Sequence, residues 1–264
     1  MKAAQALVRA RLVREGEQRR DLPAGAYSFS NDASAVASCV TGDNLALALT
    51  ILGPVEENRR TVMWLLRHQR HDGGWLYCHR WSWKARAKTK LLGARRLEWP
   101  EESDPATRSC RFGTFRAMRG LATLPDELRD DVVCKALTRG AEFFLARGVT
   151  GQLENPTEDA RPKVRSFSRS FALVGTPVRQ TLDMLAVARL LVDLGYGPDP
   201  RLARTLERLR DAQGADGRWK CETNGPGMLG AEEQPAGEPA KLVTIDALAL
   251  LRRVARSFGE ELAL

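Results

Sequence analysis

The stretches QRHDGGW (residues 69–75) and QGADGRW (residues 213–219) are the most informative pattern in this chain. Both have the form Q-x-x-D-G-x-W, and each follows a segment with the amphipathic pattern of a helix. Gly73 and Gly217 allow the left-handed backbone that ends many helices. The glutamine and the tryptophan add a hydrogen-bonding amide and a large aromatic ring. We therefore expect each loop to fasten the helix before it to the helix after it.

A pair of helices recurs around these loops. One member is rich in alanine and leucine and poor in charge, whereas the other carries charged residues along one face. The expected pairs are residues 42–53 with 56–69, 113–124 with 127–147 and 181–195 with 200–213, and a last apolar helix covers residues 241–251. No single pair can bury its apolar face, so the pairs are expected to stack with the apolar helices inside. Aligning the inner helices puts Asp43, Gly113, Asp183 and Asp246 at equivalent positions.

The two loops resemble the glutamine–tryptophan repeat of the squalene cyclase and protein prenyltransferase superfamily. The run from Gly74 through Cys78 and Cys110 to Pro125 looks like that of small bacterial prenyltransferase-like and cyclase-like proteins. The resemblance covers about residues 28–257 and implies an all-α fold, the α/α toroid. The chain departs from full-length toroids in having four clear inner helices instead of six. The ring is therefore open, or it is completed by irregular segments or by a partner chain, as in a homodimer.

The composition argues for a globular protein and against a membrane-spanning or exported one. The 264 residues are 43% hydrophobic and 28% charged, which is typical of a globular chain with a sizeable core. No apolar run approaches the roughly 18–20 residues that cross a bilayer, and no leader pattern opens the chain. Five widely spaced cysteines indicate reduced thiols, so we expect a cytoplasmic protein, either free or peripheral at a membrane. No long linker interrupts the chain, which predicts a single domain at residues 26–264 after an N-terminal helical arm at residues 1–25.

Asp43, Asp183 and Asp246 are the candidate catalytic residues. The loop that leaves each outer helix arrives at the N-terminal end of the next inner helix, so the three carboxylates are expected on one rim. The resemblance implies that this rim faces a cavity, where a carboxylate can protonate an alkene, stabilise a carbocation or bind a metal. Asp183 is the preferred candidate. The alternative is structural, because aspartate caps helices and complements the helix dipole.

Cys39, Cys78, His79 and Cys110 are candidate metal ligands on the same rim, and Cys221 is a substitute for one of them. Zinc takes three or four sulfur, nitrogen or carboxylate ligands. Related toroid families bind zinc through cysteine, histidine and aspartate, although neither of their motifs is present here. The alternative is a set of small buried thiols and a hydrogen-bonded histidine. The cofactor is therefore zinc or remains unassigned.

Residues 79–99 carry a dense basic cluster interleaved with tryptophans. Arg80, Trp81 and Trp83 of this cluster are candidate substrate-binding residues, together with Arg111 and Phe112 at the start of an inner helix. The net charge of +8 indicates an anionic partner. A diphosphate-bearing or apolar small molecule and a membrane surface both fit, whereas nucleic acid is the least favoured because no binding module accompanies the cluster. The alternative is a solvated loop.

The resemblance implies a cyclase- or prenyltransferase-like enzyme that holds an apolar, isoprenoid-like substrate in the toroid cavity. Rim carboxylates and a bound zinc would then supply acid, base or Lewis-acid chemistry. The D-x-D-D acid motif and the D-D-x-x-D magnesium motif are both absent, which argues against standard terpene cyclisation. The alternative function is a non-catalytic lipid- or peptide-binding module on the same fold, because a fold alone does not fix function.

Overall fold

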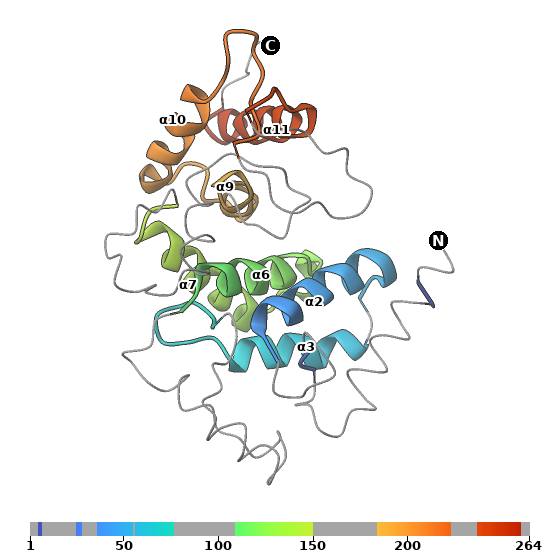
Figure 1. The fold of residues 1–264 in the computed structure, drawn as a ribbon. Coiled ribbons are helices and arrows are strands. Elements are labelled where there is room, and N and C mark those ends of the chain that lie inside the picture. The colour runs from blue at the N-terminus through green and yellow to red at the C-terminus, as the bar shows by residue number, and fades with distance from the viewer. Residues whose placement is uncertain are drawn as a thin grey trace, which may run out of the picture. The chain divides into compact units, whose positions relative to one another are not determined.

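A computed structural model describes residues 5–6, 25–27, 36–54, 56–76, 109–149, 184–222 and 237–259. Within these ranges every regular element is helical, and the extended pairings are isolated bridges (Figure 1). The all-α expectation is therefore confirmed. The chain divides into two compact units, Met1–Phe143 and Phe144–Leu264. The N-terminal arm lies almost wholly outside the described residues, and the single domain at residues 26–264 stays a prediction.

The first unit contains two of the expected inner helices side by side (Figure 1). Its helices are α2 (Ser38–Leu52), α3 (Glu56–Arg67), α6 (Arg111–Ala122), the 3-10 turn η3 (Asp126–Leu128) and α7 (Asp131–Leu145), which continues across the unit boundary. Most residues of α2 and α6 are buried, as expected for inner helices. α2 begins four residues before the expected start at Gly42. This glycine lies inside the helix and does not mark its boundary.

Glycines bring α2 and α6 into close contact. A Cβ atom at Gly42 would lie 2.1 Å from the carbonyl oxygen of Arg116, and one at Gly120 would lie 2.9 Å from the Cα of Gly42. Real Cβ atoms do not approach a backbone so closely, so only glycine fits at either position. The two backbones therefore cross at Gly42 and Gly120.

The second unit holds the remaining repeats. Its elements are α9 (Met184–Asp193), the 3-10 turn η4 (Pro200–Leu202), α10 (Ala203–Asp211) and α11 (Lys241–Ser257). α9 packs against both α10 and α11. α11 continues six residues beyond the expected end at residue 251. Its buried residues, Val243, Ala247, Leu250 and Ala255, form a narrower stripe than those of α2 or α6.

The two tryptophans of the Q-x-x-D-G-x-W loops are fully buried and are held in the same way. The indole Nε1–H of Trp75 donates to the carbonyl of Leu65 at 2.8 Å, and that of Trp219 donates to Leu209 at 2.7 Å. Both acceptors lie ten residues upstream, on the outer helix that leads into the loop. Gly73 and Gly217 have φ angles of 84° and 76°, as expected for these loop glycines.

The loop backbone then binds the next inner helix. The N–H of Trp75 donates to Oγ1 of Thr114 at 3.0 Å, the N–H of Cys110 donates to the carbonyl of Trp75 at 2.9 Å, and the N–H of Thr114 returns to the carbonyl of Cys110 at 2.9 Å. The same three bonds recur in the second unit. The N–H of Trp219 donates to Oγ1 of Thr244, the N–H of Ala240 donates to the carbonyl of Trp219, and the N–H of Thr244 donates to the carbonyl of Ala240. We call this set of bonds the loop clamp. The expectation that each loop fastens successive helices is confirmed.

A third loop clamp precedes α2, where the sequence pattern did not indicate one. The N–H of Tyr27 donates to Oγ1 of Thr41 at 3.1 Å, and the N–H of Ala37 donates to the carbonyl of Tyr27 at 3.2 Å. Gly25 has a φ of 85°, matching the glycines of the other two loops. Tyrosine replaces tryptophan here, and Asp21 stands where the motif has glutamine, so this copy does not match the Q-x-x-D-G-x-W pattern.

Candidate functional site

The clamp threonines fix the register of the inner helices. Thr41, Thr114 and Thr244 make the same bonds, so the residues two positions later, Asp43, Arg116 and Asp246, are equivalent. The expected equivalence of Asp43 with Asp246 is confirmed. The expected equivalence of Gly113 with these aspartates is wrong. α6 begins at Arg111, so Gly113 is its third residue, whereas Asp43 and Asp246 are the sixth residues of their helices.

Asp43 is bound by two arginines of the neighbouring inner helix. Its Oδ2 accepts a hydrogen bond from Arg116, and its Oδ1 accepts one from Arg119 at 2.8 Å. The side chain of Arg116 is 9% exposed, and its guanidinium lies 4.9 Å from the centre of the Phe112 ring. Phe112, predicted to bind substrate, is buried and contacts this arginine. Both oxygens of the Asp43 carboxylate are therefore engaged, which suits a structural ion pair between α2 and α6.

Asp246 has a different environment within the second unit. One oxygen, Oδ1, accepts a hydrogen bond from Arg189 of α9 at 3.0 Å, and the side chain is 18% exposed. Burial raises the pKa of Asp246, and the nearby positive charge of Arg189 opposes part of that rise. A carboxyl with a raised pKa is better suited to donate a proton near neutral pH.

The capping interpretation is wrong for Asp43 and Asp246. The N-cap residues of α2 and α11 are Ala37 and Ala240, and neither helix has a side-chain cap bond. Both aspartates lie beyond the first turn, where the helix dipole has little effect. Asp183 lies outside the described residues, although the sequence places it two residues after Thr181, as Asp43 follows Thr41.

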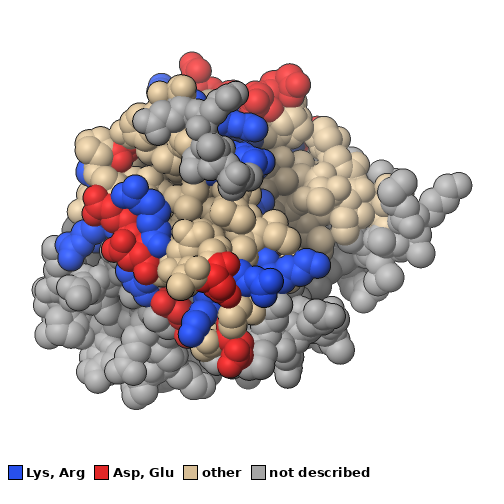
Figure 2. Space-filling view, turned by 90° about the horizontal axis from the view of Figure 1, so that it is seen from above, with Lys and Arg blue, Asp and Glu red and all other residues tan. Residues whose placement is uncertain are grey.

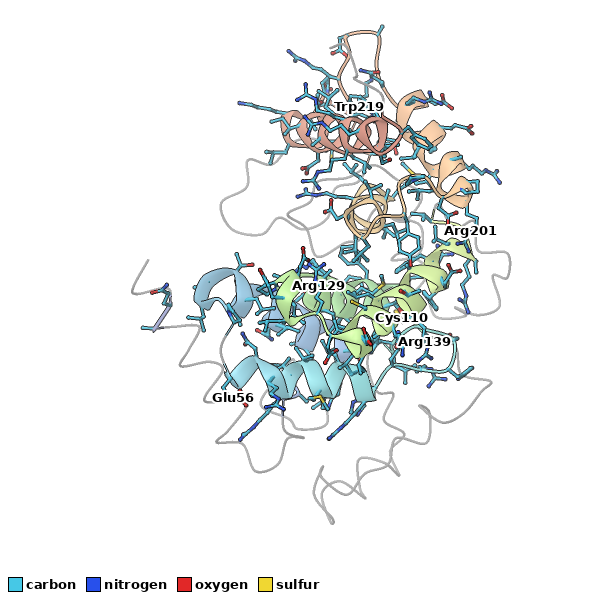
Figure 3. The ribbon with its side chains drawn as sticks, turned by 180° about the vertical axis from the view of Figure 1, so that it is seen from behind. Glu56, Cys110, Arg129, Arg139, Arg201 and Trp219 are labelled. Atoms are coloured by element: carbon cyan, nitrogen blue, oxygen red, sulfur yellow. The ribbon has the colours of Figure 1, made fainter. Side chains whose placement is uncertain are left out.

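The cysteines take several environments. Cys39 is buried in the first turn of α2, Cys110 is the half-buried N-cap of α6 (Figure 3), and Cys221 is buried just after the second loop. Cys134 is exposed on α7, where its Sγ lies 3.4 Å from the carbonyl of Arg129. Within the described ranges no group of three or more His, Cys, Asp or Glu side chains is placed to hold a metal ion.

Two of the proposed zinc ligands, Cys78 and His79, lie outside the described residues. The zinc site therefore stays a prediction. Arg80, Trp81 and Trp83 also lie outside them, so the role of the basic cluster stays a prediction too.

Figure 2 shows acidic and basic side chains interspersed on the described part of one face. Charge of one sign is not concentrated on that face. Arg111, another candidate for substrate binding, is the half-buried first residue of α6. No helix in the described part of the chain is both long and apolar enough to cross a membrane.

Three arginines were missed as members of the site: Arg116, Arg119 and Arg189. A signal was present, because Thr-x-Asp occurs at residues 41–43, 181–183 and 244–246, and Thr-x-Arg replaces it at 114–116. Opposite charges at one register position suit an ion pair between neighbouring helices, as Asp43 and Arg116 form one. The pattern gives no signal for Arg119 or Arg189. No family model matches the sequence, and no curated protein matches it.

Proposed function

We propose that the chain is an α/α-toroid enzyme of the cyclase or prenyltransferase type, acting on an apolar, isoprenoid-like substrate. The observation that supports this proposal is the loop clamp, which recurs before α2, α6 and α11 with the same bonds. Repetition of one helix-to-helix connection is typical of solenoid and toroid architectures. The loop clamp before α2 is a third copy with a divergent sequence, beside the two loops that resemble the superfamily repeat.

Asp246 is the proposed general acid, because it is half-buried and this burial raises its pKa. Asp183 shares its Thr-x-Asp pattern and is the second proposed acid. Asp43 is assigned a structural role, because both of its oxygens bind arginine. Zinc, with Cys39, Cys78, His79 and Cys110 as its proposed ligands, would act as a Lewis acid; elemental analysis of protein purified without chelator tests it.

The enzyme proposal is tested with farnesyl diphosphate, geranylgeranyl diphosphate and squalene, each with and without added Zn²⁺ or Mg²⁺. We expect new products by gas chromatography and mass spectrometry, and a loss of turnover of about 10²-fold or more in Asp246→Asn, the usual range for a general acid. Asp211→Asn is the matched control, because Asp211 is an exposed aspartate at the end of α10. Absence of turnover with every substrate, or equal turnover in both variants, contradicts the assignment.

The second candidate function is a non-catalytic lipid- or peptide-binding module. The observation that favours it is the ion pair of Asp43 with Arg116 and Arg119, which uses one of the expected acids as a structural link. Calorimetric binding of an isoprenoid that is recovered unchanged, with equal affinity in Asp246→Asn, would support this function over catalysis.

A further inference from the structure

Asp246 belongs to a network of four charged side chains that joins α9 to α11. Arg189 and Asp193 are the two charged residues of α9, and both bind residues of α11. Arg189 donates to Oδ1 of Asp246 at 3.0 Å, and Arg253 donates to Oδ1 of Asp193. Nε of Arg189 also lies 4.0 Å from Oδ2 of Asp193. Arg189 therefore stands between two carboxylates, and Asp193 stands between two arginines.

The two oxygens of the Asp246 carboxyl have different surroundings. Oδ1 accepts the hydrogen bond of Arg189, whereas Oδ2 has no hydrogen-bond partner in the described part of the chain. An oxygen that accepts from a guanidinium has its electron pair directed at that donor, so the protonated carboxyl carries its proton on the other oxygen. Asp43, at the equivalent position of α2, has both oxygens bound by arginine and leaves neither for this purpose.

Asp193 competes with Asp246 for Arg189. Arg189 and Asp193 lie four residues apart on α9, which is the spacing of an ion pair within a helix. Their separation of 4.0 Å is nevertheless longer than the 3.0 Å from Arg189 to Asp246. Arg253 accounts for the difference, because it binds Asp193 directly and neutralises the competing charge.

We propose that Arg189 is the positioning residue of Asp246, and that Arg253 keeps Arg189 available by binding Asp193. Arg189 holds Oδ1, so the proton to be transferred is on Oδ2. When the Oδ2–H bond breaks, its electron pair stays on the carboxylate and the proton forms a bond to the acceptor atom of the substrate. Arg189 then stabilises the negative charge that remains. The catalytic use of this proton rests on the function proposed above, whereas its placement does not.

The charges around Asp246 give each member of the network a predicted sign. Burial raises the pKa of Asp246, and the positive charge of Arg189 opposes that rise. Loss of a positive member should therefore raise the pKa further, and loss of the negative member should lower it. Beyond the network, the charged residues of α11 itself are Lys241, Arg252 and Arg256.

The test is the pH titration of Asp246 in the full chain, followed by NMR of the side-chain carboxyl carbon in protein with labelled aspartate. Asp246→Asn assigns the signal. Arg189→Gln should move the titration midpoint to higher pH, and Arg189→Lys, which keeps the charge, should restore much of the wild-type value. Arg253→Gln should also raise the midpoint, because Asp193 then competes for Arg189. Asp193→Asn should lower it.

Arg252→Gln is the matched control, because it removes the same charge from the neighbouring position of α11. Arg252 is exposed and makes no ion pair with another described residue, so its loss should leave the midpoint unchanged. Equal midpoints in wild type and Arg189→Gln would overturn the proposal. Equal shifts in Arg252→Gln and Arg253→Gln would also overturn it, since the effect would then be one of net charge. Circular dichroism melts verify folding, and the opposite shifts of Arg253→Gln and Asp193→Asn decide the matter if Arg189→Gln does not fold.

The titration needs no substrate, so its result is separate from that of the enzyme test. Predicted shifts without turnover of any substrate would support the placement of the proton and contradict the enzyme proposal. With a substrate that is turned over, Arg189→Gln should move the alkaline limb of the pH dependence of kcat to higher pH, because a general acid acts in its protonated form. An alkaline limb that is the same in wild type and Arg189→Gln would overturn the role of Arg189.

Discussion

At the scale of single residues, the loop clamp depends on a threonine hydroxyl inside the core. Thr114 is fully buried, and its Oγ1 accepts the backbone N–H of Trp75 while donating to the carbonyl of Cys110 at 2.8 Å. Thr114→Val keeps the shape and leaves a buried N–H without its acceptor. We expect a loss of about 1–3 kcal/mol in the free energy of unfolding, measured by urea denaturation.

Thr138→Val is the control for this measurement. Thr138 is exposed on α7, and its hydroxyl also donates to a carbonyl four residues upstream, that of Cys134. Its replacement should change the free energy of unfolding by less than about 0.5 kcal/mol. Similar losses in the two variants would show that the clamp bond contributes nothing beyond an ordinary threonine bond within a helix.

We expect His68 to make the stability of the first unit dependent on pH. Its ring stacks on Trp64 with centroids 4.0 Å apart, and its Nδ1 lies 2.7 Å from the Trp64 carbonyl. Burial is the main cause that lowers the pKa of His68 below 6.5, and the backbone hydrogen bond opposes it. The unfolded chain therefore binds a proton more readily, so this contribution is complete above pH 6.5 and is lost as the pH falls.

We expect His68→Gln to have a flatter pH dependence of unfolding than the wild type between pH 7 and pH 5. The difference between the slopes should not exceed about 1.4 kcal/mol per pH unit, the limit for one proton. Urea denaturation at several pH values measures it. His71→Gln is the control, because His71 is the exposed histidine of the adjacent loop. Parallel profiles for wild type and His68→Gln would exclude His68 as the cause.

At the scale of elements, the crossing of α2 and α6 depends on glycine. Gly42→Ala places a Cβ atom 2.1 Å from the Arg116 carbonyl oxygen, so the helices must separate. We expect a loss of about 1–3 kcal/mol in the free energy of unfolding, as for other overpacked cores. At an unobstructed helix position the same change would stabilise the helix by about 1 kcal/mol, so the sign of the effect tests the crossing. Thr50→Ala, at an exposed position of α2, controls for the change in the helix itself.

The helices of the repeat could be predicted from the sequence, because their apolar periodicity is local information. The starts of α2 and α6 were less accurate, since Gly42 and Gly113 suggested boundaries and lie within helices. The loop before α2 was missed because the clamp needs a backbone N–H and a large aromatic ring, which Tyr27 supplies without the motif. The ion pair of Asp43 joins residues 73 and 76 positions apart, and no periodicity encodes such a contact.

At the scale of the whole molecule, the excess of positive charge predicts binding to anionic surfaces. With a net charge of +8, the chain should sediment with vesicles containing phosphatidylserine at low salt and dissociate as added salt screens the charges. Vesicles of phosphatidylcholine alone are the control. Replacing Lys84, Arg86, Lys88 and Lys90 together by glutamine should weaken the binding if the basic cluster is responsible. Retention by neutral vesicles, or at high salt, would contradict an electrostatic attachment.

The three loop clamps differ in how much chain they enclose. The bond from the loop N–H to the threonine spans 14 residues at Tyr27, 25 at Trp219 and 39 at Trp75, with nearly the same geometry. Loop-closure entropy grows only logarithmically, by about 0.6 kcal/mol for each doubling of length. The interval between a loop and its threonine is therefore a site where insertions cost little stability. New segments can therefore be added just before α2, α6 and α11 while these helices stay unchanged.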